Sequence, residues 1–380
     1  MTTTINNEHK KLNVPNLRFP EFQGEWMEST IGKQFELYSG NTPSRLNKDY
    51  FKGEINWISS GELKDHYIYS SKEKISQEAS LNLKLLPAGT FVIAIYGLEA
   101  EGVRGTGSII KEQSTISQAC MAFSSIGEVE NEFLYSWYKK HGNIIGLKYA
   151  QGTKQQNLSY DILERFKIAY PSKQEQEKLC NFISLLDERI ATQNKIIDKL
   201  QSLIKGIAQN VAHNNKPNIS LSECLECSSS TLQESDVCEN GTYPVYGANG
   251  IVGYLDNYNT EKEAVYIIKD GSGVGTVSYV TGKCSATGTL NILQAKEGYS
   301  LQYLYYLLKV FNFEPYKTGM AIPHIYFKDY GKAKVFCPSY TEQLQYARLL
   351  YAIESKLSIE KNILTNLSLQ KQYLLRQMFI

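Results

Sequence analysis

Long hydrophobic runs are missing from this chain of 380 residues. No run of 18 apolar residues occurs, and the first dozen residues are polar rather than basic and apolar, as a secretory leader would be. Hydrophobic residues still make up 42% of the sequence, enough for the cores of two or three domains. We therefore expect a cytoplasmic protein with no membrane partner, whose residues 1–12 are disordered.

An excess of charge is also missing. The 40 Lys and Arg residues nearly balance the 39 Asp and Glu residues, so the net charge is +1. The chain is not a globally basic nucleic-acid binder. Local patches can still attract DNA, because they matter more than the sum. If DNA is the ligand, we expect partner proteins to supply part of the affinity.

Metal-ligand spacing is likewise lacking. Seven scattered cysteines, an odd number, fit a reducing compartment. Cys224 and Cys227 form one C-x-x-C, but a second ligand pair at suitable spacing does not follow, so we interpret them as free thiols. The five histidines show no ligand spacing either. We predict no metal site.

Catalytic motifs are absent as well. The sequence contains no N/D-P-P-Y/F motif, on which an amino-methyltransferase stacks its flipped base, and no G-x-x-x-x-G-K-S/T phosphate loop. The glycine-rich stretch 270–276 lacks the lysine and the following helix of such a loop, so its glycines serve a tight turn. We expect neither catalytic nor cofactor-binding residues, which disfavours a self-sufficient methyltransferase or nuclease.

What the chain does have is an internal repeat. The segment 152–190 (GTKQQNLSYDILERFKIAYPSKQEQEKLCNFISLLDERI) matches 319–357 (GMAIPHIYFKDYGKAKVFCPSYTEQLQYARLLYAIESKL). Gly319 follows Gly152 by 167 residues, and Gln343 follows Gln176 by the same 167. Two copies of one unit predict a two-headed protein that recognises two similar things.

Each copy ends in a long amphipathic helix. In the first helix the apolar seam alternates spacings of four and three, as in a coiled coil: Leu179, Ile183, Leu186, Ile190, Gln193, Ile197, Leu200, Ile204, Ile207 and Val211. Adding 167 gives a second seam from Tyr346 to Met378, in which Glu360 matches Gln193. We predict that the two helices, each ~60 Å long, pair with each other. Lys371 in place of Ile204 indicates that part of the second seam is exposed or meets another protein. Two helices of one ordinary core are the alternative, which the length of the stripes disfavours.

A β-rich region precedes each helix. Short segments rich in Tyr, Ile, Val and Phe alternate with Gly, Pro, Asn and Ser, and the order of elements is shared while the residues at the turns differ. A short helix then follows in each copy, over 131–145 and over 300–312. The fold class is therefore α+β, with two β-rich domains related by the repeat and two long antiparallel helices that separate them.

The chain resembles the specificity subunits of type I restriction–modification systems. The resemblance rests on an ordered set of segments over nearly the whole chain: NVPNLRFPEFQGEW, YSGNTPS, INWISSGEL, GTKQQNLSYDIL, YPSKQEQEKLCNFISLLDERI, YPVYGANGIVGYLDNY and DGSGVGTVSYV. One segment departs from the pattern, because GMAIPHIYF lacks the Gly-Thr-x-Gln-x-Asn of the first copy. That departure leaves the DNA role of the second junction in doubt.

The resemblance implies a domain plan and a set of partners. Residues 1–172 and 214–338 would be target-recognition domains, and 173–213 and 339–380 would be conserved spacer helices. Each domain would recognise one half of a split site on double-stranded DNA, while the helices set the gap and dock two methyltransferase subunits. Restriction subunits would then join. No cofactor would bind this chain, since S-adenosylmethionine belongs to the methyltransferase partner, and ATP and Mg to the restriction partner.

Polar side chains on loops are the candidates for DNA contact, because they pair with base edges and phosphates. In the first domain these are Ser39, Asn41, Thr42, Ser44, Arg104, Lys154 and Gln155; in the second they are Tyr246, Asn249, Lys269, Ser272, Lys317 and His324. Arg104 is the best candidate for guanine and Asn249 for adenine. The alternative for each is a solvated or hydrogen-bonded loop residue.

Apolar residues off the seams are candidates for binding the methyltransferase subunits: Phe182, Leu185, Leu203, Leu349 and Leu375. The alternative is a wider buried stripe between the two helices. A non-catalytic adapter or scaffold, whose two heads bind protein or another polymer, remains the second hypothesis for the whole chain.

Overall fold

The computed structural model describes residues 13–152, 154–213, 215–319 and 321–380. The disorder expected for residues 1–12 lies outside them. The chain divides into two compact units. The first unit contains the residues up to Thr192 together with Leu364–Ile380, and the second is Gln193–Ile363. Each unit is described by itself.

The first unit contains a β-rich domain, here called the first head, built on two sheets. A five-stranded sheet has the order β2-β9-β6-β7-β4, and a three-stranded sheet has the order β5-β3-β8. The strands are β2 (Phe35–Ser39), β3 (Ile55–Ile58), β4 (Tyr67–Ile68), β5 (Glu73–Ile75), β6 (Phe91–Ala94), β7 (Gly107–Ile110), β8 (Ser114–Ile116) and β9 (Cys120–Ser125). Short helices α2 (Gln77–Ser80), η1 (Lys48–Phe51) and η2 (Ser60–Glu62) join them.

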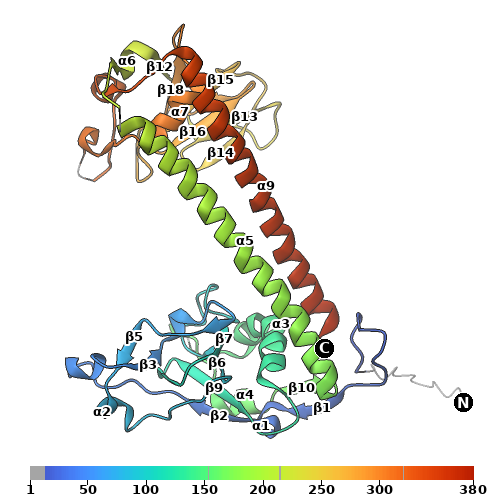
Figure 1. Cartoon of the computed structure of the whole chain (residues 1–380). Helices are drawn as coiled ribbons and strands as arrows, with labels where there is room; N and C mark the ends of the chain where they lie inside the picture. Colours follow the sequence, from blue (N-terminus) through green and yellow to red (C-terminus); the bar gives the residue numbers. More distant parts are fainter. Residues whose placement is uncertain (1–12, 153, 214, 320) are drawn as a thin grey trace, which may run out of the picture. The chain divides into compact units, whose positions relative to one another are not determined.

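One helix covers the five-stranded sheet. This helix, α3 (Asn131–Tyr149), packs on β6, β7 and β9 (Figure 1). Strand β6 is buried on both faces, so it consists of the apolar residues Phe-Val-Ile-Ala instead of alternating polar and apolar ones. The core between sheet and helix is aromatic: Phe91, Phe123, Phe133 and Tyr135 are all buried there.

The second unit contains the second head, which repeats this plan. A four-stranded sheet has the order β12-β18-β15-β16, and a three-stranded sheet has the order β14-β13-β17. The strands are β12 (Leu225–Ser229), β13 (Tyr243–Gly247), β14 (Gly250–Leu255), β15 (Glu263–Ile268), β16 (Val277–Thr281), β17 (Ser285–Ala286) and β18 (Leu290–Ala295). The 3-10 turns η3 (Glu234–Asp236) and η4 (Glu314–Tyr316) complete the loops, and helix α7 (Leu301–Val310) covers the larger sheet.

The repeat is also visible at the base of each head. In the first head β1 (Met27–Thr30) pairs with β10 (Lys167–Tyr170), and in the second β11 (Ile219–Ser220) pairs with β19 (Lys334–Val335), both antiparallel. Short helices occupy matching places: α1 (Ile31–Gln34) and α4 (Tyr160–Glu164), then α6 (Leu221–Cys224) and α8 (Phe327–Tyr330). The predicted shared order of elements is confirmed.

Two long helices follow the heads, α5 (Lys173–His213) and α9 (Tyr340–Met378). They run antiparallel in each unit, as their contacts show. In the first unit Lys371 pairs with Asp187, and in the second Gln193 donates to the backbone oxygen of Glu360 at 3.1 Å. The seam residues of α5 and α9 are buried or half-buried. The predicted pairing of the helices is confirmed, and the structure adds that the repeat-related Gln193 and Glu360 contact each other.

One expectation about the seam is wrong. Lys371 is neither exposed nor free for another protein, because its side chain is only 16% exposed and its ammonium pairs with Asp187 of α5. A lysine is tolerated in the seam since the carboxylate of Asp187, a residue outside the seam, compensates its buried charge.

The start of α9 carries a helix-capping arrangement. The Ser339 hydroxyl accepts from the Glu342 N–H at 3.4 Å, and the Glu342 carboxylate accepts from the Ser339 N–H at 3.1 Å. Such a reciprocal pair satisfies two N–H groups that the helix leaves without intrahelical partners. In α5 the equivalent acid, Glu175, instead pairs with Arg18 at 2.7 Å and ties the entry segment to the helix.

Two of the sequence expectations concern membranes and thiols. Within the described part of the chain, no helix combines the length and the apolarity needed to cross a bilayer.

Cys224 and Cys227 are free. Burial raises the pKa of Cys224 to about 12 and that of Cys227 to about 11, so both thiols keep their protons at neutral pH.

Candidate nucleic-acid interface

A short hairpin lies between α3 and α4 in the sequence of the first head. The backbones of Gln151 and Asn157 exchange hydrogen bonds of 2.8 and 2.9 Å, which close the turn. Gly152 has φ = +121°, and a Cβ there would lie 2.1 Å from the Gln155 carbonyl oxygen. Only glycine allows this turn, because other residues avoid such backbone angles. We call residues 151–157 the first hairpin.

The second head has the same hairpin at the repeat-related place. Thr318 and His324 exchange backbone hydrogen bonds of 2.9 and 2.7 Å, and Gly319 has φ = +89° with its Cβ position 2.3 Å from the Ile322 oxygen. We call residues 318–324 the second hairpin. The backbone bonds and the glycine conformation of the second hairpin match those of the first although the side chains differ, and the DNA role of this junction stays a prediction.

The two hairpins are also attached to their heads in the same way. Leu158 donates its N–H to the Ile95 oxygen at 2.9 Å, and Ile325 donates to the Lys269 oxygen at 2.9 Å. A second pair of bonds holds the hairpin arm to a neighbouring loop, from Leu98 to Gln156 and from Gly271 to Pro323, each 3.0 Å. The heads therefore present one scaffold twice, with different side chains on it.

The first hairpin lies beside the end of β2. A surface hollow of about 480 Å³ is lined by Ser39, Tyr96, Tyr160 and the hairpin residues Gln151 and Asn157, among others. The predicted candidates Lys154 and Gln155 lie on the same hairpin and are exposed. The structure thus brings Ser39 together with the region of Lys154 and Gln155, although more than 100 residues separate them in sequence.

The loop after β2 carries the candidates Asn41, Thr42 and Ser44. The Asn41 oxygen accepts from the indole N–H of Trp57 at 3.1 Å, and its backbone N–H donates to the Ile116 oxygen at 3.1 Å. The side chains of Asn41 and Ser44 remain exposed, and that of Thr42 is half-exposed. The loop is therefore held by its backbone and by the Asn41 side-chain oxygen, which accepts from the Thr42 N–H at 2.8 Å, while the side chains of Thr42 and Ser44 stay available.

Arg104 already has structural partners. Its guanidinium donates to the Leu98 oxygen at 3.0 Å, to the Glu99 oxygen at 3.1 Å and to the Asn143 side chain at 3.2 Å. It is half-buried. These bonds fix the 98–104 loop that supports the first hairpin. Some of the five N–H donors of the Arg104 guanidinium are therefore already used within the protein. A guanine contact by the remaining donors stays a prediction.

In the second head, three candidates meet at the second hairpin. Lys269 and Ser272 lie on or beside the tight turn that follows β15, where Gly271 and Gly275 have φ of +94° and +90°. His324 Nδ1 lies 2.6 Å from Asp270 Oδ1. This turn therefore packs on the hairpin, and the carboxylate of Asp270 reduces the positive charge of the surface beside His324.

The other candidates of the second head lie apart from this turn or at its edge. Tyr246 is half-buried in β13 with its ring 5.9 Å from that of Tyr266, whereas Asn249 is exposed at the tip between β13 and β14. Lys317 precedes the second hairpin and pairs with Glu314 at 2.6 Å. Tyr246 therefore contributes packing as well as any DNA contact.

Sequence reasoning missed two residues of these surfaces, Asn157 and Asp270. Asn157 aligns with the candidate His324 at the constant offset of 167, which was the signal available in the sequence. Asp270 gave no such signal, because its contact with His324 spans 54 residues.

The predicted partner-binding residues of the helices divide into exposed and buried ones. Leu185, Leu203 and Leu349 are 64%, 48% and 49% exposed, as a partner surface requires. Phe182 is half-buried against Phe19, with ring centroids 5.9 Å apart.

The expectation for Leu375 is wrong. The side chain is 6% exposed and belongs to the core of the first unit, together with Phe133 and Phe379. The stripe of α9 widens beyond the seam there, because the helix is covered by the first head as well as by α5.

Comparison with known proteins agrees with this double scaffold. A family model described as the type I restriction modification DNA specificity domain matches the chain twice, over residues 23–202 and 218–369. The specificity subunit of the type I restriction enzyme EcoprrI from Escherichia coli is 22% identical over 357 residues, which are 86% of each chain. The MjaIX specificity subunit from Methanocaldococcus jannaschii is 30% identical over 187 residues, which are 46% of this chain and 42% of that one.

The fold has solved counterparts. A crystal structure of the type I restriction–modification S subunit from M. genitalium superposes with a TM-score of 0.66 over 97% of this chain and 99% of that chain, at 20% identity. A second structure, from work on assembly and conformational transition of the type I R-M system, has a TM-score of 0.54 over 93% and 97%, at 17% identity. With the family model matched over both heads and most of both long helices, the protein belongs to the family of type I restriction–modification DNA specificity domains and carries two copies of that domain.

Proposed function

We propose that this chain is the DNA specificity subunit of a type I restriction–modification complex and has no catalytic activity of its own. Each head recognises one half of a split site on double-stranded DNA. The observation that carries this is the pair of hairpins, which share backbone hydrogen bonds and differ in side chains, since Lys154 and Gln155 are replaced by Ala321 and Ile322. One scaffold with two sets of side chains suits two half-sites of different sequence.

The proposed domains have the bounds predicted from the sequence. Residues 1–172 and 214–338 are the target-recognition domains, and 173–213 and 339–380 are the spacer helices. Helices of ~60 Å are long enough for two reading surfaces about one DNA turn apart, ~34–36 Å. The exposed leucines Leu185, Leu203 and Leu349 offer apolar contacts to two methyltransferase subunits.

The remaining parts of the reaction belong to the partners. S-adenosylmethionine binds the methyltransferase subunits, and ATP and Mg bind the restriction subunits, which join last. The complex works on cytoplasmic DNA and needs no membrane. The adapter hypothesis, in which the heads bind protein or another polymer, stays as the alternative.

The test is methylome sequencing of a methylation-free host that expresses this chain with its cognate methyltransferase subunit. The expected result is a split motif with a fixed gap and a methylated adenine in each half. A stable, correctly assembled complex that adds no methylation would contradict the proposal and favour the adapter. Methyl transfer by the purified single chain would contradict its non-catalytic role.

A further inference from the structure

One carboxylate in each unit links the long helices to the covering helix of the head. Asp187 of α5 and Glu354 of α9 are related by the repeat, because Glu354 follows Asp187 by the same 167 residues. Asp187 lies in the first unit near α3, and Glu354 lies in the second unit at α7. Neither residue belongs to the coiled-coil seam.

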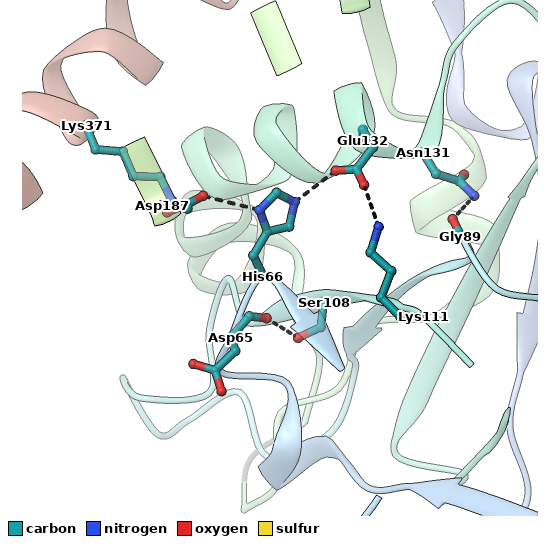
Figure 2. A network of polar contacts seen from close by, with 9 residues as sticks. All are labelled: Asp65, His66, Gly89, Ser108, Lys111, Asn131, Glu132, Asp187 and Lys371. Carbon is teal, nitrogen blue, oxygen red and sulfur yellow. Dashed lines mark hydrogen bonds and ion pairs between the residues drawn. The ribbon is translucent and has the colours of Figure 1, made fainter. Parts of the chain in front are cut away.

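In the first unit Asp187 connects three elements (Figure 2). Its carboxylate pairs with Lys371 of α9, and its Oδ2 lies 3.4 Å from His66 Nδ1, in the loop before β4. The other ring nitrogen of His66 lies 2.9 Å from Glu132, in the first turn of α3. Lys111 extends the chain of contacts to Glu132 at 3.9 Å. His66 thus bridges the helix pair and the covering helix of the head.

Two rings hold His66 in this position. The imidazole is stacked between Tyr67, at 3.9 Å, and Tyr135 of α3, at 4.0 Å. Only 9% of its side chain is exposed. The ring therefore has one orientation, and both of its nitrogens face carboxylates.

In the second unit Glu354 has the same place with different partners. It accepts from the Tyr306 hydroxyl at 2.7 Å, from the Tyr305 hydroxyl at 3.2 Å and from the Lys309 ammonium at 3.0 Å, all on α7. Its side chain is 32% exposed. The head helix is therefore tied to α9 by three charge-assisted hydrogen bonds, which have directional geometry.

The electrostatics show that both carboxylates are held in the charged form. Burial alone would raise the pKa of Asp187, but His66 and Lys371 outweigh it and lower the pKa. Burial opposes the charge of Glu354 too, and Tyr306 and Lys309 lower its pKa. Burial would lower the pKa of His66, whereas the bonds to Asp187 and Glu132 raise it.

The apolar part of each head–helix contact is non-directional, and the hydrogen bonds of Gln176 and Gln343 lie at the first turn of α5 and α9, away from Asp187 and Glu354. Leu179, Ile183 and Leu374, for example, pack with the first head through side chains that tolerate small rotations. The ion pair of Asp187 with the stacked ring of His66 and the three hydrogen bonds of Glu354 add an angular constraint further along the helices, where head and helix meet. A small rotation there moves the hairpins, and one base pair along B-DNA is only ~3.4 Å.

We propose that Asp187 and Glu354 are positioning residues that fix the angle of each head on its helices and thereby set the gap length between half-sites that the protein accepts. This inference rests on the proposed function. The accepted gap length then depends both on the length of the helices and on one carboxylate contact in each unit.

The test uses the full chain in complex with its methyltransferase subunit. Methyl transfer is measured on duplexes whose site has the natural gap, or a gap one base pair shorter or longer. Glu354→Gln and Asp187→Asn keep the shape of the side chain and remove its charge. We expect each to lower the preference for the natural gap by about tenfold, the scale of one lost charge-assisted hydrogen bond, while base preference within each half-site stays unchanged. Glu28→Gln is the matched control, because the Glu28–Lys167 pair at 2.8 Å joins two strands of the same head.

A second variant covers the case of poor folding. Tyr306→Phe removes only one hydroxyl from Glu354 and should also broaden the gap preference. An unchanged preference in variants that remain folded by circular dichroism would overturn the inference. The proposed function fails separately, if the wild-type complex methylates no split site at all.

A pH profile distinguishes positioning from a general loss of structure. The groups that face or surround His66 are Asp187, Lys371, Glu132, Tyr135, Lys139, Tyr67, Asp65 and Lys111. Burial lowers the pKa of Lys139 to about 8, so the range from pH 6.0 to 7.5 is used. We expect gap preference to weaken as pH rises, because His66 loses the positive charge that attracts the carboxylates of Asp187 and Glu132. His66→Gln should abolish this dependence, whereas Glu354→Gln should retain it; the same dependence in both variants would overturn the assignment to His66.

Discussion

At the scale of single residues, two buried glutamines hold the heads on their helices. Gln176 is 1% exposed; it accepts from the Glu130 N–H and donates to the oxygens of Glu128 and Pro171, all at 3.0 Å. Gln343 does the same for Ser300 and Pro338 at 2.9 Å. The repeat conserves this contact between its two copies although the surrounding residues differ.

Replacing Gln176 tests the weight of this contact. Gln176→Leu keeps the volume but leaves one N–H and two carbonyl groups without their partner. We expect the free energy of unfolding to fall by about 2–4 kcal/mol, measured by urea denaturation. Gln174→Leu, at an exposed position of the same helix turn, is the control and should change it by less than about 0.5 kcal/mol. Equal effects of the two variants would contradict the role of Gln176.

The contribution of His141 to stability depends on pH with the opposite sign to that of His66, because its pKa is lowered and that of His66 is raised. Burial lowers its pKa to about 4, although its Nε2 lies 3.0 Å from the Ile380 backbone oxygen. The unfolded chain takes up this proton first, near pH 6.5, so stability is lost as pH falls from about 6.5 towards 4. Thermal melts across this range should show a smaller loss in His141→Gln than in the wild type. A loss of the same size would mean that His141 is not its source.

The sequence predicted the seam residues, but it did not predict that the charge of Lys371 in the seam is paired with a carboxylate of the other helix. Periodicity marked Lys371 as a break in the apolar stripe, but nothing in the pattern identified Asp187 as its partner, because Asp187 lies on another helix and outside the seam. Leu375 failed for a related reason. A helical stripe predicts which residues face the paired helix, whereas the first head covers α9 from a different direction.

At the scale of elements, the hairpins depend on their glycines. Gly152→Ala would place a methyl group against the Gln155 oxygen and force a backbone angle that alanine avoids. We expect at least about tenfold weaker methylation of a cognate duplex, with a change in the melting temperature below about 4 °C, because the hairpin lies outside the core. Gly61→Ala is the control, since its Cβ would lie in open space in the same head.

The contrary outcome is equally informative. Full methylation by a folded Gly152→Ala complex would separate the first hairpin from DNA recognition. Gly319→Ala applies the same test to the second hairpin, where the sequence pattern departs from the first copy.

The elements themselves were largely accessible from sequence. The seam period, the constant offset and the Gly and Pro punctuation predicted both long helices, the covering helices α3 and α7 and the β-rich heads. Strand pairing was not accessible, because the paired residues of β3 and β8, such as Asn56 and Ser114, are far apart in sequence and the short strands carry little periodicity. For the candidate interface, sequence suggested the polar loop residues, but which of them meet, as Ser39 and the first hairpin do, depends on that pairing.

At the scale of the whole molecule, the low net charge limits the non-specific electrostatic part of DNA affinity. With +1 over 380 residues, the chain has few basic side chains in excess to replace phosphate counterions. We expect the purified chain to bind a cognate duplex with a Kd weaker than roughly 1 μM at 150 mM salt, measured by fluorescence anisotropy. Addition of the methyltransferase subunit should tighten binding and steepen its salt dependence. Tight, site-specific binding by the chain alone would contradict this prediction and show that the heads bind DNA without the methyltransferase subunit.

The first unit is built from two separate stretches of the chain, which affects how it folds during synthesis. Its core includes Leu374, Met378 and Phe379, which pack against Phe133, whereas the second unit is one continuous segment, Gln193–Ile363. A ribosome makes the first head early, but the residues that complete its core are made only after the second unit. The second unit can therefore finish folding first, against the usual N-to-C order of domains. The nascent first head meanwhile exposes the apolar surface that α9 will cover, until Leu374, Met378 and Phe379 have been synthesised.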